Sequence, residues 1–382
     1  MLWPALCVLL FFTCLAPLII SGQAVQARGL TYQGFGTMTI GGARGEDFVV
    51  TTLNDSGPGS LRDALSRGHR SIQFSTGGEI TLKSRLYVKG AYLTLDGFSA
   101  PWPGITLKNY GLRINGDKGA HDIIVQGIRV RITSRQPGVE DGITVSHGAF
   151  NVVIDHVSIS GASDESIGIV RGAHDVTVSW SILATPLLGH HTNMLIFSEA
   201  TRLSIHHNLF FEASRRNPWI AYNKAGERAP ELQADVRNNV MWGVSGPGTD
   251  HGTVVFDGGT ANIVNNYYKA VATKDRSIQK RVIMVCGSKN RLEDLFFCWK
   301  GRRPAAGVYV KGNISQDGWT DYINTKGTRV HPFPAPPVET TDACPAAHQV
   351  VASAGVRPLD TLDTRYLSQI SLRACDKHTR AP

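Results

Sequence analysis

Charged residues are scarce in this chain, and their scarcity sets the first bounds on its fold. Asp, Glu, Lys and Arg make up 18% of the 382 residues, while 42% are apolar. A chain of this length and balance can bury a sizeable core in one large or two ordinary domains. Its 40 glycines are spread among many Val, Ile and Thr, a composition typical of short strands joined by turns. We therefore expect an all-β fold, and the composition disfavours an all-helical one.

Acidic residues are fewer than basic ones. There are 31 Asp and Glu against 39 Lys and Arg, which gives a formal charge of +8. This excess favours a polyanionic partner such as nucleic acid, an anionic surface or an acidic polysaccharide. An ordinary solvated basic surface is the alternative that charge alone leaves open.

Cysteine is absent between Cys14 and Cys286. The four that follow are Cys286, Cys298, Cys344 and Cys375, and none of them forms a CxxC pair, which disfavours a cysteine metal site. We expect two disulfides in an oxidising compartment instead. Proximity in the sequence favours pairing Cys286 with Cys298 and Cys344 with Cys375, one of three possible connectivities.

Charge is also absent from residues 2–20, an uncharged hydrophobic run. A small and polar region follows, so residues 1–27 are typical of a secretory signal peptide and predict a secreted or periplasmic protein. No Lys or Arg precedes the run, which leaves an uncleaved membrane anchor open. The run is at the lower limit for a bilayer span and contains two prolines, and both features favour cleavage.

Short apolar segments recur through the middle of the chain at intervals of 24 to 31 residues. Their centres are Leu95, Val125, Ile154, Val178, Ile205, Val236 and Ile263. These intervals fit the coils of a solenoid. Two or three short strands per interval fit a parallel β-helix better than a propeller, whose blades need four antiparallel strands and about 40 residues. We predict such a solenoid within residues 28–310, with its coils starting at about residue 45.

Asparagines fall at matching positions of successive intervals. Asn208, Asn239 and Asn266 predict an internal asparagine ladder at a turn, a structural role and not a catalytic one.

The two ends of the solenoid carry different signals. Ser60 and Asp63 are placed to cap a short helix, which we expect to cover the amino-terminal end. Beyond residue 310 the pattern fades, and we expect residues 311–382 to form an irregular tail packed on the solenoid. Within this tail, residues 344–354 are compatible with a short amphipathic helix and residues 359–365 with a turn.

Three groups of polar residues are expected to meet on one face, because equivalent positions in successive coils lie about 4.8 Å apart. They are the acidic pairs Glu140-Asp141 and Asp164-Glu165, the pair His190-His191 and the pair Arg215-Arg216. Carboxylates one coil apart make an oxygen-rich site suited to Ca²⁺. Each of these residues taken singly is more often a solvated turn residue, but their combination in a basic protein favours a functional site.

Five motifs follow one another in a fixed order. They are the segments at residues 152–158, 164–167, 176–180, 205–210 and 216–218. In order and spacing they resemble the motifs of the pectate lyases that fold as a right-handed parallel β-helix. The resemblance covers roughly residues 45–270.

This resemblance implies cleavage of a polygalacturonate-like polymer by β-elimination, in which a base removes the C5 proton of a uronate and the C4 oxygen leaves. It implies an acidic polysaccharide and not nucleic acid as the partner, and Ca²⁺ as the cofactor that acidifies the proton. Arg216 matches the family's proton-abstracting arginine, and Asp141 and Asp164 match acidic positions of the calcium site. An arginine with an unperturbed pKa above roughly 12 is a poor base near neutrality, so an alkaline optimum or a perturbed environment is needed.

The sequence departs from the family pattern at three positions. The acidic residue expected four positions after Asp164 falls on Gly168, and Glu165 is the candidate substitute. The lysine expected near Thr192 and the arginine expected near Ala221 are missing. The candidates for binding the substrate in their place are Arg171, His190, His191 and Lys224. Arg215 is a further candidate for substrate binding.

Two alternatives remain at this point. A glycoside hydrolase on the same solenoid would need two carboxylates flanking the scissile bond, which Asp141, Asp155 and Asp164 could supply, but it would have no special use for Arg216. A non-catalytic carbohydrate-binding solenoid is the other alternative, because fold alone does not fix function.

The remaining expectations concern the other histidines and the state of the protein. We interpret the Asp155-His156 pair and the pair His206-His207 as mainly structural. We expect a monomer with no stable membrane association once the signal peptide is removed.

Overall fold

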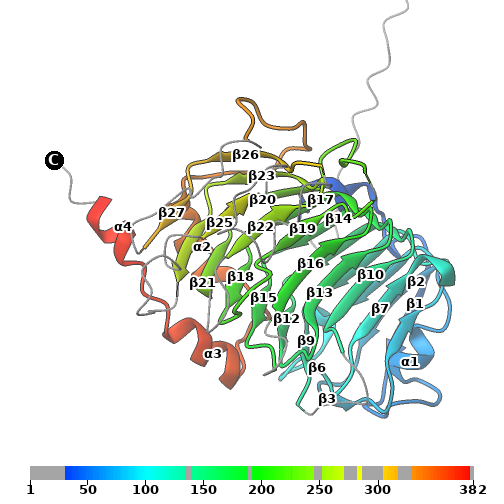
Figure 1. Cartoon of the computed structure of the whole chain (residues 1–382). Helices are drawn as coiled ribbons and strands as arrows, with labels where there is room; N and C mark the ends of the chain where they lie inside the picture. Colours follow the sequence, from blue (N-terminus) through cyan, green and yellow to red (C-terminus); the bar gives the residue numbers. More distant parts are fainter. Residues whose placement is uncertain are drawn as a thin grey trace, which may run out of the picture.

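The computed structural model of the chain describes residues 31–133, 140–187, 192–224, 226–244, 252–270, 282–285, 304–316 and 328–378. Successive short strands wind into a parallel β-helix with three sheets, as Figure 1 shows. The strands of each sheet pair in parallel with strands one coil before and after them. The predicted all-β, parallel β-helix fold is therefore confirmed.

The three sheets differ in length and in role. A ten-stranded sheet contains β1 (Glu46–Val50), β2 (Arg70–Phe74), β5 (Leu93–Asp96), β8 (Ile123–Gln126), β11 (Phe150–Asp155), β14 (His174–Ser179), β17 (Thr201–His206), β20 (Ala234–Arg237), β23 (Thr260–Val264) and β26 (Gly307–Lys311). An eight-stranded sheet contains β4 (Leu86–Val88), β7 (Leu112–Asn115), β10 (Ile143–Ser146), β13 (Glu165–Val170), β16 (Thr192–Phe197), β19 (Trp219–Ala221), β22 (Thr253–Phe256) and β25 (Ile283–Val285). A nine-stranded sheet contains β3 (Gly78–Thr81), β6 (Ile105–Lys108), β9 (Ile128–Arg131), β12 (Ser158–Ser160), β15 (Ile182–Ala184), β18 (Leu209–Phe211), β21 (Val240–Val244), β24 (Tyr267–Ala270) and β27 (Ile314–Ser315).

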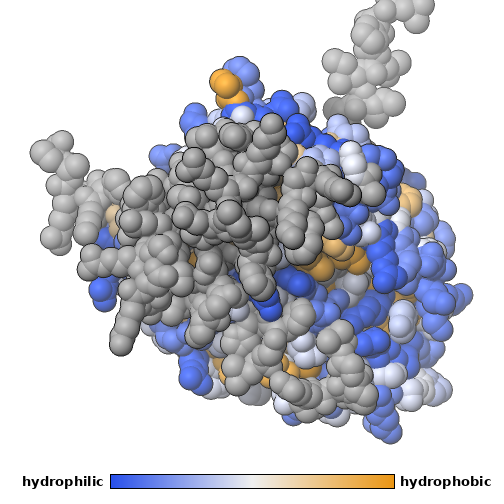
Figure 2. Space-filling model, viewed as in Figure 1, coloured by the Kyte–Doolittle hydropathy of each residue, from blue (hydrophilic) through white to orange (hydrophobic). Residues whose placement is uncertain are grey.

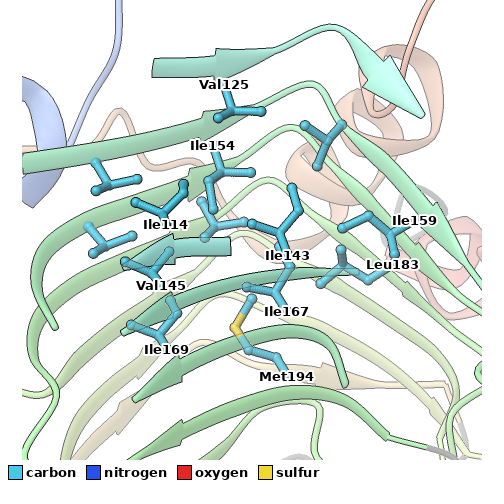
Figure 3. Close-up of a cluster of buried hydrophobic side chains, with 14 of the residues drawn as sticks. Ile114, Val125, Ile143, Val145, Ile154, Ile159, Ile167, Ile169, Leu183 and Met194 are labelled. Carbon is cyan, nitrogen blue, oxygen red and sulfur yellow. The ribbon is translucent and has the colours of Figure 1, made fainter. Parts of the chain in front are cut away.

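The predicted strand centres occupy one row of the ten-stranded sheet. Leu95 pairs with Val125, Val125 with Ile154, and the row continues coil by coil to Ile263. The side chains of this row and of the matching rows in the other sheets point inward and are fully buried. Figure 3 shows them stacked in layers, with Val125 and Ile154 facing Ile143, Ile167 and Met194. Burial of like residues at each coil is what keeps the coils in register.

The asparagine ladder is present and is one residue longer than predicted. The Oδ1 atom of Asn239 accepts hydrogen bonds from the backbone N–H and the side-chain amide of Asn208, at 2.9 and 3.0 Å. The Oδ1 atom of Asn266 accepts the same two hydrogen bonds from Asn239, and the Oδ1 atom of Asn313 accepts them from Asn266. All four residues are buried, so each amide satisfies polar groups that have no access to water.

Replacing Asn239 with alanine is expected to lower the free energy of unfolding by about 2 kcal/mol, because two buried donors of Asn208 would lose their acceptor. Chemical denaturation of the variant and the wild type measures the difference. The matched control is Asn54→Ala in an exposed turn, which should change stability by less than about 0.5 kcal/mol. Equal effects of the two substitutions would contradict a structural role for the ladder.

The amino-terminal part of the described chain forms a cap and an arm. Helix α1 (Leu61–Ala64) begins as predicted at Ser60, whose hydroxyl accepts the Asp63 N–H. Leu61 and Ala64 are buried against the core next to β1. The arm consists of residues 31–45, which precede β1. It contains the short 3₁₀ helix η1 (Phe35–Met38), which packs on β11, β14 and β17. Gly36 has to be a glycine there, since a Cβ would lie 2.3 Å from the Val152 carbonyl oxygen.

The carboxyl-terminal tail is more regular than predicted. It forms α2 (Ala343–Ser353), α3 (Thr361–Ser368) and α4 (Arg373–His378), so the turn expected at residues 359–365 is instead the start of α3. Apolar residues of the tail pack on β15, β18, β21 and β24 of the nine-stranded sheet. The predicted disulfide between Cys344 and Cys375 is present and joins α2 to α4.

The signal peptide expected at residues 1–27 and the expected pairing of Cys286 with Cys298 lie outside the described residues. Within the described ranges, no helix combines the length and the apolar character that a membrane span requires.

Candidate active site

The outward face of the eight-stranded sheet brings together the charged residues that the sequence singles out. At the centres of β10, β13 and β16 the inward positions are apolar and buried, and the positions that alternate with them point outward. One outward row runs from Tyr87 through Arg113, Thr144 and Gly168 to Leu195 and Trp219. The acidic residues Asp141, Asp164 and Glu165 precede this row in the sequence and lie at the amino ends of β10 and β13.

Three carboxylates form a compact cluster. Each of Asp141, Asp164 and Glu165 offers an oxygen atom within 4.8 Å of the oxygen atoms of the other two. One Asp141 oxygen accepts the backbone N–H of Glu165 at 3.2 Å, and the other accepts the Thr144 hydroxyl. The parallel pairing of β10 with β13 therefore places carboxylates from successive coils side by side.

Glu140 is not part of this cluster. Its side chain is fully buried, and its oxygens bind the guanidinium groups of Arg85 at 2.5 Å and Arg113 at 3.0 Å. It also accepts the Gly111 N–H at 3.0 Å. These contacts neutralise the charge of Glu140 and fix the turn before β10. Of the Glu140-Asp141 pair, only Asp141 therefore belongs to the carboxylate cluster.

Arg216 lies beside the cluster. Its guanidinium forms an ion pair with Glu165 and lies 5.3 Å from the centre of the Trp219 ring. The residue has a φ of +61°, a left-handed conformation that is uncommon outside glycine. Hydrogen bonds hold this turn: the Met194 N–H donates to the Arg216 carbonyl at 2.7 Å, and the Asn217 side chain donates to Ala213 at 3.1 Å.

Burial changes the proton affinities of the site in a consistent way. Desolvation raises the pKa of Asp141 to about 6, against the opposing effects of Arg113 and the Thr144 hydroxyl. Desolvation also lowers the pKa of Arg216, while the negative charges of Asp164 and Asp141 act in the opposite direction. The ionised form of Asp141 is therefore poorly solvated in the folded protein, and the neighbouring Arg216 is less basic than an exposed arginine.

The three departures from the family pattern all fall on this sheet. Gly168 lies in the outward row, and a Cβ there would be 3.2 Å from an Asp141 oxygen, so the missing carboxylate would have joined the cluster. Thr192 is fully buried, and its hydroxyl donates to the Asp164 carbonyl at 2.8 Å. Ala221 is also fully buried. Neither of the two missing cations is replaced at its own position.

The candidate substrate-binding residues lie at different places. Arg215 pairs with Thr192, which pairs with Glu165, so it lies next to the cluster. Arg171 follows the carboxyl end of β13 and contacts His147 at 2.9 Å, while Lys224 follows β19 and pairs with Glu199 and Glu227. Since β13 has six residues at about 3.3 Å each, Arg171 lies roughly 20 Å from Glu165. His190 and His191 lie outside the described residues.

The structure also identifies polar and apolar neighbours that the sequence interpretation missed. Arg113 and Thr144 contact the acidic residues directly, and their signal is the alternation of polar and apolar residues along β7 and β10. Figure 2 shows an apolar patch in the region where Figure 1 places β13 and β16. Val170, Leu195 and Phe197 are the outward, partly exposed apolar residues of these two strands.

The histidines interpreted as structural belong to the other side of the coil. His156 bonds to Asp155 at 2.6 Å, and His206 and His207 are almost fully buried and contact each other at 3.0 Å. They lie at the carboxyl ends of strands in the ten-stranded sheet and not at the carboxylate cluster.

Comparison with curated proteins shows similarity to one group. No protein-family model matches the chain. A probable pectate lyase C of Aspergillus fumigatus is 34% identical over 280 residues, which cover 66% of this chain and 64% of that protein. A probable pectate lyase C of Emericella nidulans is 35% identical over 253 residues, covering 62% of this chain and 58% of that protein. The chain thus spans less than two thirds of the length of these fungal relatives.

Solved structures agree with the fold. The cedar pollen allergen jun a 1 superposes with a TM-score of 0.64 at 22% identity and covers 85% of this chain and 93% of its own. The pectate lyase Bsp165PelA from Bacillus sp. N165, solved in complex with trigalacturonate, superposes with a TM-score of 0.61 at 19% identity over 85% of this chain and 98% of its own. By its sequence relatives and by its parallel β-helix, the chain is related to the pectate lyases.

Proposed function

We propose that the protein is a secreted polysaccharide lyase that cleaves a polygalacturonate-like polymer by β-elimination, with Arg216 as the base. The observation that carries the proposal is the position of Arg216 beside three carboxylates that lie within 4.8 Å of one another on an outward sheet face. The similarity to proteins named pectate lyase supports the same activity.

The carboxylate cluster fits Ca²⁺. Its three members supply hard oxygen ligands from two successive coils. Burial, and to a smaller extent the charges of Asp164 and Glu140, raises the pKa of Asp141, so a bound cation would favour its ionised form. Glu165 can serve both a cation and Arg216, because a carboxylate has two oxygens that accept independently. A bound Ca²⁺ would act as a Lewis acid toward the uronate carboxylate and so make the C5 proton more acidic.

The chain's own groups can account for the proton transfer. Arg216 would take the C5 proton while the C–H electron pair forms the C4–C5 double bond and the C4–O bond breaks, with the leaving oxygen protonated from solvent. Among the described residues, the Nε atoms of Arg215 and Arg216 are buried without a hydrogen-bond partner, so the protein does not fully satisfy either guanidinium. Glu165 orients the guanidinium through its ion pair but also favours the charged form, so we expect an alkaline optimum.

The hydrolase alternative has less support. Hydrolysis needs an acid and a second carboxylate on either side of the scissile bond, about 5 Å apart in retaining enzymes and farther apart in inverting ones. Here the carboxylates form one cluster that suits a shared cation, and Asp155 is on the other side of the coil, bonded to His156 and to Ser179 at 2.6 Å. Within the described residues, Asp155 therefore cannot flank a scissile bond together with Asp141 or Asp164.

The other sequence-based assignments stay part of the proposal. We assign Arg215 to the uronate unit at the cluster, and Arg171 and Lys224 to units farther along the polymer. The hydrophobic run at residues 2–20 supports secretion, and we keep the expectation of a monomer.

Incubation of the protein with polygalacturonate and Ca²⁺ tests the proposal. A lyase produces unsaturated ends that absorb in the near ultraviolet, and a chelator should stop their formation. New reducing ends without this absorbance would identify a hydrolase, and neither product would identify a binding protein.

Restoring the missing carboxylate should strengthen the cation site. Gly168→Asp is expected to tighten Ca²⁺ binding by about tenfold in the absence of substrate, because ligand charge count sets affinity in such sites. Asp141 has to move by a few tenths of an ångström to admit the new side chain. Isothermal titration with Ca²⁺ measures the change.

The matched control is Gly172→Asp, which adds the same charge in an open turn beyond the far end of β13. Its Ca²⁺ affinity should equal that of the wild type. If Gly168→Asp binds Ca²⁺ no better than this control, the cation does not bind beside Asp141.

A further inference from the structure

A cavity lies near the amino-terminal end of the solenoid, on the side that carries the carboxylate cluster. It has a volume of about 410 Å³ and is lined mainly by Arg62, Arg85, Tyr87, Lys89 and Tyr110. Arg62 belongs to α1, Tyr87 to β4, and Tyr110 precedes β7. Figure 2 shows a largely hydrophilic surface over the region where Figure 1 places α1 and β7.

The pairing of the strands connects this cavity to the carboxylate cluster. Tyr87 pairs with Arg113, and Arg113 pairs with Thr144, whose hydroxyl donates to Asp141. All three point outward from the same sheet. With about 4.8 Å between neighbouring strands, Tyr87 lies about 10 Å from Thr144. The same extended polymer can therefore contact both places.

Two arginines that line the cavity form hydrogen bonds with other groups of the protein. Arg62 donates to the Asp55 carboxylate at 2.6 Å and to the Ser84 and Arg85 carbonyls, both at 2.9 Å. Arg85 donates to Glu140 at 2.5 Å. These contacts fix the turn before β4 and hold its backbone in place. We treat both arginines as positioning residues.

Three other polar groups in the cavity have no such partner. Among the described residues, no hydrogen bond or ion pair engages the Tyr87 hydroxyl, the Lys89 ammonium or the Tyr110 hydroxyl. The Lys89 side chain is exposed, and Tyr87 has an exposed fraction of 39%. A cavity that collects one cation and two aromatic hydroxyls without internal partners is suited to a polar ligand with one negative charge.

We propose that this cavity is a remote subsite for one uronate unit of the polymer, with Lys89 binding its carboxylate. The ring of Tyr87 or Tyr110 packs against the sugar ring, and the hydroxyls bond to sugar oxygens. The inference rests on the proposed function for the identity of the polymer. It adds that substrate binding extends from the carboxylate cluster toward α1, where no family motif of the sequence lies.

Binding measurements on the full chain test the subsite. In an Arg216→Ala background, which prevents consumption of the ligand, titrations compare size-fractionated polygalacturonate with trigalacturonate bound at the carboxylate cluster. Lys89→Ala is expected to weaken binding of the polymer about two- to fivefold, the effect of one exposed ion pair. Binding of the trimer should not change. Lys89→Arg should keep most of the affinity, and Tyr87→Ala should also weaken only polymer binding.

The control variant is Lys311→Ala, which removes an exposed lysine at the end of β26 in the ten-stranded sheet. It should leave polymer binding unchanged. An equal loss in this control, or an equal loss for polymer and trimer with Lys89→Ala, would overturn the subsite.

The test separates the subsite from the proposed function. If the wild type forms no unsaturated product but Lys89→Ala still weakens polymer binding selectively, the lyase proposal fails and the subsite stands. If the wild type is an active lyase and Lys89→Ala binds the polymer normally, only the subsite fails. If the protein does not bind the polymer at all, both fail.

Discussion

Replacing Arg216 with alanine is expected to reduce the turnover of polygalacturonate by about 10²- to 10⁴-fold, the usual contribution of a positioned general base. The protein should still bind Ca²⁺, because the three carboxylates remain and lose a competing positive charge when the ion pair with Glu165 is removed. The rate of unsaturated product formation and the Ca²⁺-induced shift of the melting temperature measure the two effects separately. Arg216→Lys should also lose most activity, since lysine lacks the planar guanidinium.

The control for this variant is Arg44→Ala, which removes an exposed arginine of the amino-terminal arm. Its turnover should equal that of the wild type. Near-normal lyase activity in Arg216→Ala would show that another group removes the proton. Loss of the Ca²⁺ response in the same variant would show that Arg216 acts on the cation site and not as a base.

Replacing Asp141 with asparagine is expected to stabilise the metal-free protein above pH 6. The folded-state pKa of Asp141 is raised to about 6 from the model-peptide value of 3.8. For an acid with a raised folded-state pKa, the stabilising contribution is fully present below about pH 4 and is lost as the pH rises through about 6. At pH 8 the ionised carboxylate therefore costs up to about 3 kcal/mol, which the neutral amide avoids.

Urea denaturation at pH 5 and pH 8 in the presence of a chelator measures this effect. Asp141→Asn should raise the free energy of unfolding at pH 8 by about 1–3 kcal/mol and should abolish stabilisation by Ca²⁺. The control is Asp47→Asn on β1, an exposed carboxylate that should have little effect at either pH. A variant that is less stable than the wild type at pH 8 without Ca²⁺ would contradict the view that the cluster carries unbalanced charge.

The sequence predicts the coils well because their register depends on local repetition. The row from Leu95 to Ile263 and the ladder through Asn208, Asn239 and Asn266 recur at each coil, so equivalent residues must stack. The same logic brings Asp141 next to Glu165. The spacing of residues along the sequence is sufficient to predict a contact wherever the two residues lie in neighbouring coils.

Contacts between distant segments could not be predicted in this way. The arm at Gly36 packs on Thr177, and Arg131 of β9 binds Asp360 and Asp363 near the start of α3, at 2.8 and 2.9 Å. These pairs are separated by more than a hundred residues and have no periodic signal. The wrong prediction of a turn at residues 359–365 has the same origin, because burial of Asp363 against the solenoid favours a helix there.

The same limit affects the cations of the candidate site. Arg171 and Lys224 are basic and near the expected positions in the sequence, but they follow the carboxyl ends of β13 and β19. A strand carries the chain away from the cluster by about 3.3 Å per residue, so a shift of a few residues becomes a large distance. The sequence does not predict a role for Lys89, because the cavity that it lines forms only when β4 stacks against β7.

The origin of the oxygen atom at the cleaved bond tests the central claim most directly. Polygalacturonate is incubated with the protein and Ca²⁺ in water enriched in heavy oxygen, and the products are analysed by mass spectrometry. β-Elimination breaks the C4–O bond without adding water, so the products should carry a C4–C5 double bond and, after correction for slow exchange at reducing ends, no heavy oxygen from the cleavage. Saturated products with one heavy oxygen per cleaved bond would identify hydrolysis and contradict proton abstraction by Arg216.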